Sequence, residues 1–157
     1  MSTRELPLDH DEALIEAALR VVEKRFIRNN AREPLTSPGM VRGYLSIRLH
    51  SLEHEVFVCI WLDSQHRVID VEQMFAGTLT QTSVYPREIV KRALAVNAAA
   101  VLFAHNHPSG VAQPSQADEL LTRNLREALA LVDVKVLDHF IIAGNHAISF
   151  AERGLLV

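Results

Sequence analysis

The sequence predicts a layered domain in which helices and strands alternate, either α/β or α+β. Two observations support this prediction. Residues Glu55–Leu62 form a nearly continuous apolar run rich in β-branched and aromatic residues, which is typical of a buried strand. Segments with helical spacing of apolar residues lie on both sides of this run, so helices and strands are not segregated along the chain.

The first fifty residues are predicted to be a helical extension of that layered core. Apolar residues spaced three and four apart predict a helix from about Asp11 to Arg28, with Asp9 or Asp11 as its cap. Its apolar stripe comprises Leu14, Ala17, Ala18, Val21, Val22 and Phe26. The stretch N-N-A-R-E-P-L-T-S-P-G ends it, and a second helix is expected after Ser37, with Pro38 in its first turn.

The remaining chain alternates between strand and helix patterns. Val68–Phe75 follows the turn D-S-Q-H-R and is expected to pair with the first strand as a hairpin. The further predicted elements are a helix from Pro86 to Val96, a strand at Ala98–Phe103, a long helix from Ser115, and strand segments at Val134–Leu137, Phe140–Ala143 and Ala147–Phe150.

Composition narrows the class of protein. The length of 157 residues and the hydrophobic content of 48% fit one globular domain with its own core. A net charge of −3 gives no general reason to bind nucleic acid. The single cysteine, Cys59, cannot form an internal disulfide and is expected in the core of a protein from a reducing compartment. Because neither a signal peptide nor a membrane-spanning run is recognisable, we expect a cytoplasmic protein without a membrane partner.

One short stretch, A-H-N-H-P-S-G-V-A-Q-P-S-Q-A-D, concentrates residues that bind metals. His105 and His107 are two positions apart after a predicted strand, so in extended backbone their side chains point the same way. Asp118 lies in the first turn of the next predicted helix and offers a third, oxygen ligand. Two imidazoles and one carboxylate suit zinc and leave a fourth position open, as in catalytic zinc sites.

Each part of this stretch also has an ordinary structural explanation. Ser115 and Asp118 match a capping box at the start of a helix, and Pro108 and Gly110 are typical of a turn. Ser115 is also placed to donate a hydrogen bond to a developing oxyanion, and its one hydroxyl is expected to serve the cap and the oxyanion alternately.

A hydrolytic site needs a proton carrier, and two glutamates lie at the start of the first predicted strand. Glu53 and Glu55 are both candidates for general acid or base catalysis, because a carboxylate at the mouth of a buried strand tends to have a raised pKa. The ordinary alternative is a solvated strand terminus. His139, in predicted strand material beside Asp138, is interpreted as a polar core residue or one that orients a ligand histidine.

The metal motif and its surroundings resemble the RadC-like JAB-domain proteins of bacteria. The run from His105 to Asp118 fits the JAMM signature of the JAB/MPN metallo-isopeptidase superfamily: His-x-His, seven residues, Ser, two residues, Asp. The stretches V-Y-P-R-E-I-V-K-R-A-L-A-V-N, D-V-K-V-L-D-H-F-I-I-A-G and S-F-A-E-R-G-L-L are also similar to this family. We expect a domain at residues 36–157, preceded by a helical extension at residues 1–35.

The resemblance implies a JAB/MPN fold of α-β-α layers around a mixed sheet, related to the cytidine-deaminase-like fold. It implies Zn²⁺ held by His105, His107 and Asp118, with Ser115 stabilising the oxyanion. In RadC-like sequences the catalytic glutamate lies two residues before a phenylalanine, which favours Glu55, before Phe57, over Glu53.

The expected function is therefore zinc-dependent hydrolysis of peptide or isopeptide bonds in a protein or peptide substrate. The letters H-N-H do not indicate an HNH nuclease, whose residues are spread over a ββα unit, and a zinc deaminase would need more cysteines. The alternative is a DNA-repair-associated or other protein-binding module with little or no hydrolytic activity. Support for DNA as a partner is limited to the basic segment Lys24–Arg32, which a solvated helix end also explains.

Overall fold

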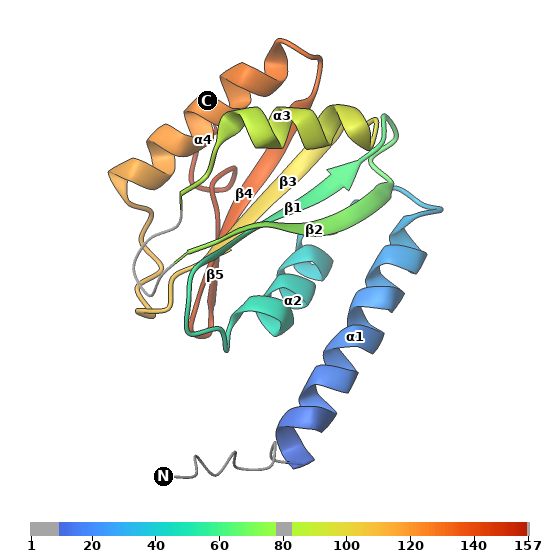
Figure 1. Ribbon diagram of the computed structural model, residues 1–157, viewed down its shortest axis with the longest axis vertical. Coiled ribbons are helices and arrows are strands. Elements are labelled where there is room, and N and C mark those ends of the chain that lie inside the picture. Colours follow the sequence, from blue (N-terminus) through green and yellow to red (C-terminus); the bar gives the residue numbers. More distant parts are fainter. Residues whose placement is uncertain (1–9, 78–82, 157) are drawn as a thin grey trace, which may run out of the picture.

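A single mixed sheet lies between two pairs of helices in the computed structural model, which describes residues 10–77 and 83–156 (Figure 1). This confirms the predicted α/β layered class. In chain order, the elements are α1 (His10–Asn30), α2 (Pro38–Leu49), β1 (Val56–Leu62), β2 (Val68–Ala76), α3 (Pro86–Ala95), β3 (Ala100–Asn106), α4 (Gln116–Ala130), β4 (Lys135–Ala143) and β5 (His146–Ser149).

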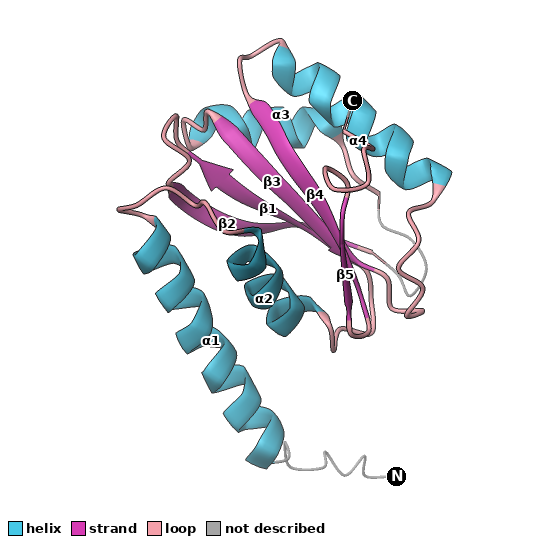
Figure 2. Cartoon of the chain, turned by 180° about the vertical axis from the view of Figure 1, so that it is seen from behind, coloured by secondary structure: helices cyan, strands magenta, loops and turns pink. Residues whose placement is uncertain are grey.

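The five strands are ordered β2-β1-β3-β4-β5, and only β3 and β4 are parallel. β1 and β2 form the expected antiparallel hairpin. Every residue of β1 and β3 is buried, because these two strands lie inside the sheet and helices cover both of its faces (Figure 2). The continuous apolar sequence of β1 follows from this two-sided burial.

Alternate residues of the inner strands supply two separate cores. Val58 and Ile60 of β1 belong to the core shared with α1 and α2, whereas Phe57 and Trp61 belong to the core shared with α3 and α4. Cys59 lies in the second core as expected, and burial raises the pKa of its thiol. Since side chains alternate along a strand, His105 at the end of β3 shares the α3–α4 side with Phe103.

The structure differs from the sequence prediction in three places. β3 continues to Asn106, so His105 lies within the strand and not after it. The separate segments predicted around residues 134–143 form one strand, β4, which runs through His139. The apolar stripe of α1 is largely exposed, and Leu14 is 70% exposed because the first turns of α1 extend beyond the sheet (Figure 1).

The helix starts follow local chemistry. Ser37 caps α2 through its side chain, and Pro38 occupies its first turn as predicted. Of the two proposed caps of α1, Asp9 lies outside the described residues, and Asp11 lies within the first helical turn. None of the described helices combines the length and apolar character that crossing a membrane would require.

Candidate metal centre

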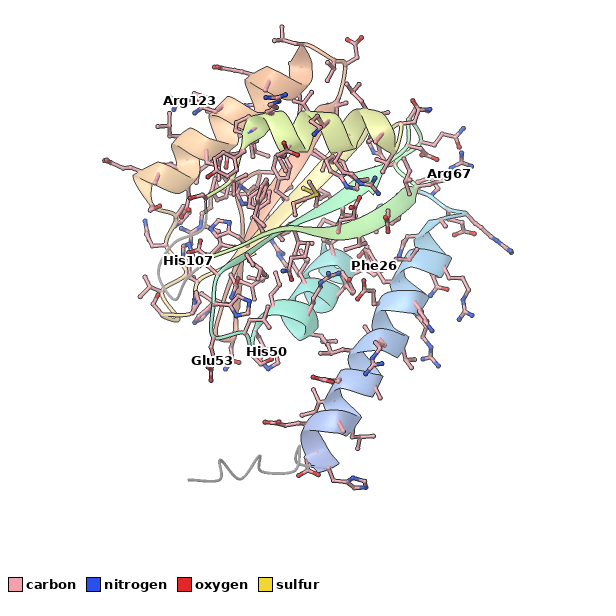
Figure 3. All side chains as sticks on the ribbon, viewed as in Figure 1. Phe26, His50, Glu53, Arg67, His107 and Arg123 are labelled. Atoms are coloured by element: carbon pink, nitrogen blue, oxygen red, sulfur yellow. The ribbon has the colours of Figure 1, made fainter. Side chains whose placement is uncertain are left out.

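The two motif histidines converge at the end of β3. His105 is buried and is the second-to-last residue of the strand, and His107 is the first residue after its end. Their Nε2 atoms are 3.0 Å apart. Figure 3 shows His107 where the inner strands end, below the start of α4. The side chains of His105 and His107 therefore point the same way, as the extended backbone predicted.

The loop after β3 fixes His107 by hydrogen bonds to backbone groups. Its N–H donates to the carbonyl of Ile142 in β4 at 2.8 Å, and its Nδ1 is 2.8 Å from the carbonyl oxygen of Val111. Gly110 has φ of +82°, a conformation that favours glycine, and its N–H donates to the His107 carbonyl. The turn thus brings the chain back toward the histidine ring.

Asp118 reaches both histidines from the first turn of α4. Its Oδ1 lies 3.3 Å from His105 Nε2, and its Oδ2 lies 3.2 Å from His107 Nε2. Burial opposes ionisation of this carboxyl, but hydrogen bonds from the two histidines outweigh that effect and lower its pKa. The hydrogen bond to Asp118 raises the pKa of His107 in turn, partly against the effect of burial.

The same residues form the capping box expected from sequence. Ser115 N–H donates to Asp118 Oδ2 at 2.9 Å, and Asp118 N–H donates to Ser115 Oγ at 3.0 Å. The hydroxyl of Ser115 acts only as an acceptor in this cap, so its hydrogen is available to a second partner. The two roles of Ser115 are therefore compatible at the same time, whereas the sequence interpretation made them alternate.

Glu55, the residue just before β1, is the fourth member of the cluster that includes His105, His107 and Asp118. One ligand atom from each of Glu55, His105, His107 and Asp118 lies within 4.8 Å of the others. Burial raises the pKa of Glu55, and the neighbouring His105 and His107 partly offset this rise. Glu53 is exposed and lies apart from His107, at the lower edge of the domain in Figure 3.

Asn106, between the two histidines, is a positioning residue that the sequence interpretation missed. Its buried side chain accepts a hydrogen bond from Val56 N–H at 2.8 Å and donates to the His54 carbonyl at 3.0 Å. These backbone groups flank Glu55, so Asn106 ties the end of β3 to the glutamate. The only sequence signal that could have indicated this role is the position of the asparagine between the two candidate ligands.

The side chain of His139 in β4 lies behind His105. Its ring is fully buried, and its Nε2 is 2.7 Å from His105 Nδ1. Burial lowers the pKa of His139, and the nearby His105 lowers it further. The second ring nitrogen is 2.6 Å from the hydroxyl of Thr122 in α4, a residue that the helical pattern alone did not single out.

The spacing of the donor atoms fits a tetrahedral metal ion. Ligand atoms about 2.0–2.1 Å from a tetrahedral zinc lie roughly 3.3–3.4 Å from one another. The two histidine Nε2 atoms are 3.0 Å apart, and each lies near a different oxygen of Asp118: His105 Nε2 is 3.3 Å from Oδ1, and His107 Nε2 is 3.2 Å from Oδ2. Two imidazole nitrogens and a carboxylate are also a donor set that zinc accepts. The cluster therefore has the chemistry and the dimensions of a metal site.

The cluster opens into a pocket with a volume of about 680 Å³, within the range of small-ligand sites. Its polar lining residues are the four clustered residues together with Ser109, Gln113 and Ser115. Its apolar wall residues include Phe57, Val84, Val111 and Leu121. A substrate in this pocket would contact both the cluster and apolar side chains.

Comparison with known proteins agrees with this arrangement. A family model described as the RadC-like JAB domain matches residues 35–155. The chain belongs to the RadC-like JAB domain family. Its fold, a mixed five-stranded sheet with four helices, is consistent with a JAB domain, and its Glu-His-His-Asp cluster is a candidate metal site.

Relatives of this RadC-like domain carry names that state no activity. A UPF0758 protein of Dechloromonas aromatica is 60% identical over 146 residues, which are 92% of this chain and 65% of that protein. A UPF0758 protein of Thiobacillus denitrificans is 61% identical over 145 residues, with the same coverage. The chain thus spans about 65% of the length of these curated relatives.

Proposed function

We propose that this RadC-like domain is a zinc-dependent hydrolase of the JAMM type that cleaves peptide or isopeptide bonds. The observation that carries the proposal is the position of Glu55. It comes from a different part of the chain, yet its carboxylate lies within 4.8 Å of the ligand atoms of His105, His107 and Asp118. A structural metal site would not need an additional carboxylate of raised pKa at the mouth of a pocket.

His105, His107 and Asp118 would hold the ion. A zinc ion bound there supplies a Lewis acid that polarises a carbonyl and lowers the pKa of water to about 7. The carboxylate of Glu55 accepts the proton from the attacking water and then donates it to the leaving amine. Its raised pKa suits both steps, because the carboxyl group then accepts and holds a proton more readily than an ordinary glutamate.

The other pocket residues position the substrate. The hydroxyl hydrogen of Ser115, which the capping box leaves available, donates to the oxygen of the scissile carbonyl as negative charge develops there. The apolar wall that includes Phe57 and Leu121 favours a substrate with an apolar side chain beside the scissile bond.

Metal analysis of the parent beside His107→Ala and Glu55→Gln tests this assignment. We expect about one zinc per chain in the parent, none in His107→Ala, and unchanged zinc in Glu55→Gln. His146→Ala, which removes an exposed histidine at the start of β5, is the matched control and should keep its zinc. Stoichiometric zinc in His107→Ala would refute the ligand assignment, and loss of zinc from Glu55→Gln would make Glu55 a ligand instead of the base.

A peptide-library screen with the zinc-loaded protein then tests catalysis. We expect cleavage by the parent, loss of cleavage in Glu55→Gln, and a decline in cleavage as pH falls through the raised pKa of Glu55, because the base must be deprotonated. A zinc-loaded parent that cleaves nothing would favour the binding-module alternative.

The DNA-associated form of that alternative has its own test. The exposed Lys24, Arg25 and Arg28 on the last turns of α1 are the cations that would contact phosphate groups. Binding of a DNA probe that weakens with salt and disappears when all three become alanine would support this alternative. No binding at low salt would exclude it.

A further inference from the structure

A chain of three hydrogen-bonding contacts connects His105 to the backbone of Asp118. His105 Nδ1 is 2.7 Å from His139 Nε2, and His139 Nδ1 is 2.6 Å from Thr122 Oγ1. Thr122 Oγ1 donates to the Asp118 carbonyl at 2.8 Å. The chain therefore begins at one candidate metal ligand and ends on the main chain of another.

The proton positions along this chain follow from its last member. A carbonyl oxygen can only accept, so the single hydroxyl hydrogen of Thr122 is used toward Asp118. Thr122 Oγ1 can then only accept from His139, which places the proton of His139 on Nδ1. The direction of every earlier contact depends on this one hydroxyl.

The surroundings of His139 favour a ring with one proton. The ring is fully buried, and its centroid lies 4.7 Å from that of Phe150, 5.6 Å from Phe57 and 5.8 Å from Phe103. A charged imidazolium in such an apolar setting carries a large desolvation cost. With Nδ1 as the donor, the Nε2 of a neutral ring accepts, so His105 must donate through its own Nδ1–H.

The consequence lies at the metal side of His105. When the His105 ring is neutral and its one proton is on Nδ1, the lone pair is on Nε2, the atom that faces His107 Nε2 and Asp118. The opposite direction of the chain would make His139 Nε2 a donor and put the proton of a neutral His105 on Nε2, where it would block a metal ion. His107 obtains the same result from one carbonyl, that of Val111, which accepts from its Nδ1.

The geometry points to Thr122 and His139 as positioning residues that hold His105 in its Nδ1–H tautomer, with the Nε2 lone pair directed at the metal. This inference rests on the metal site of the proposed function but not on hydrolysis. It gives Asp118 two tasks, one for its carboxylate and one for its backbone carbonyl, which couple α4 to both histidines.

Substitutions of Thr122 test the proposal through zinc affinity. Thr122→Val keeps the branched shape but removes the hydroxyl, so we expect zinc binding weaker by about 10–100-fold, the usual effect of losing such a partner. Thr122→Ser restores the hydroxyl and should restore affinity close to that of the parent. Equal affinity in the parent and Thr122→Val would overturn the proposal, and so would equally weak binding in both variants, which would indicate a packing role only.

Nitrogen-15 NMR of the histidine rings gives a readout that packing alone would not change. In the parent protein, with and without zinc, we expect His139 to be protonated on Nδ1 and bare on Nε2. A proton on His139 Nε2 would overturn the proposal whatever the variants do. If Thr122→Val fails to fold, His139→Gln compared with His139→Leu replaces it, because the glutamine oxygen can still accept from His105 and should preserve more of the zinc affinity.

These results separate the inference from the proposed function. A protein that binds zinc with the expected tautomers but cleaves no peptide contradicts the hydrolase proposal alone. A protein that cleaves peptides but carries the proton on His139 Nε2 contradicts the tautomer proposal alone.

Discussion

The helices α1 and α4 have similar sequence patterns but different relations to the sheet. α4 begins with a capping box, packs Leu125 and Leu129 into the core, and holds Asp118 in its first turn. α1 is longer, yet Phe26 and Asn30 near its end are its buried residues. Its first turns extend away from the domain in both Figure 1 and Figure 2.

The difference shows what a helical pattern does and does not predict. Apolar residues three and four apart predict a helix correctly in both cases, because the period reflects backbone geometry. Whether the apolar stripe is covered depends on the rest of the fold. In α4 the covered face also contains a polar residue, Thr122, whose hydroxyl contacts His139 behind the candidate ligand His105.

We expect the largest effect from a substitution in the first turn of α4, where loss of Asp118 should abolish zinc binding. Asp118→Asn keeps an oxygen able to accept from Ser115 N–H, so the helix cap is preserved while the charged ligand is lost. We expect zinc to be absent after dialysis, measured by metal analysis. Glu119→Gln removes a charge from the same turn outside the cluster and should keep its zinc. Zinc retained by Asp118→Asn would remove the functional distinction between the two helices.

We expect the next largest effect from the residue that packs α1 against the rest of the domain, measured as a change in the free energy of unfolding. Phe26 is buried and stacks on Tyr44 with ring centroids 4.3 Å apart, so Phe26→Ala should lower the free energy of unfolding by about 3 kcal/mol. Leu14→Ala, in the exposed first half, should change it by less than about 0.5 kcal/mol. Denaturant unfolding measures both. A comparable loss in the two variants would mean that the first turns of α1 have a partner in solution.

Substitutions of two buried asparagines distinguish the region around α1 from the region around the candidate metal site. Asn106→Ala leaves Val56 N–H and the His54 carbonyl without their partner, and Asn30→Ala removes a bond to the Phe26 carbonyl. Each should cost about 1–3 kcal/mol of stability. Only Asn106→Ala should also slow peptide cleavage at unchanged zinc content, because Asn106 fixes the backbone beside Glu55. Equal turnover in the two variants would show that Glu55 is positioned by other contacts.

The smallest effect is a pH dependence of the zinc-free protein. The lowered pKa of Asp118 stabilises the fold above about pH 3.9, its unfolded value, and this contribution is lost as pH falls through the lowered value. The raised pKa of His107 stabilises the fold below about pH 6.5 and is lost as pH rises through the raised value. We therefore expect the melting temperature of the zinc-free protein to decline as pH rises above about 6.5, and zinc to reverse the decline.

Asp118→Asn serves as the control for this experiment, because it removes the partner that raises the pKa of His107. Its zinc-free melting temperature should decline less over the same interval. An identical decline in the parent and Asp118→Asn would assign the pH dependence to groups outside the cluster.

Local sequence determines most of the elements and the triad of candidate ligands. The spacing of His105 and His107 on extended backbone, and of Ser115 and Asp118 at a helix start, fixes relative positions over a few residues by backbone geometry alone. The hairpin of β1 and β2 and the start of α2 after Ser37 were predictable for the same reason. Residue patterns also identified Glu55, although only a resemblance to known proteins distinguished it from Glu53.

Strand pairing and helix packing in the tertiary structure determine which distant residues come into contact. The pairing of β1 with β3, in which Phe57 lies opposite His105, brings Glu55 to the histidines from fifty residues away. The parallel pairing of β3 with β4 places His139 behind His105, and the packing of α4 adds Thr122. The tertiary structure also leaves most of α1 exposed to solvent. These outcomes depend on register and on how layers cover one another, which are sums of many long-range contacts that no local period encodes.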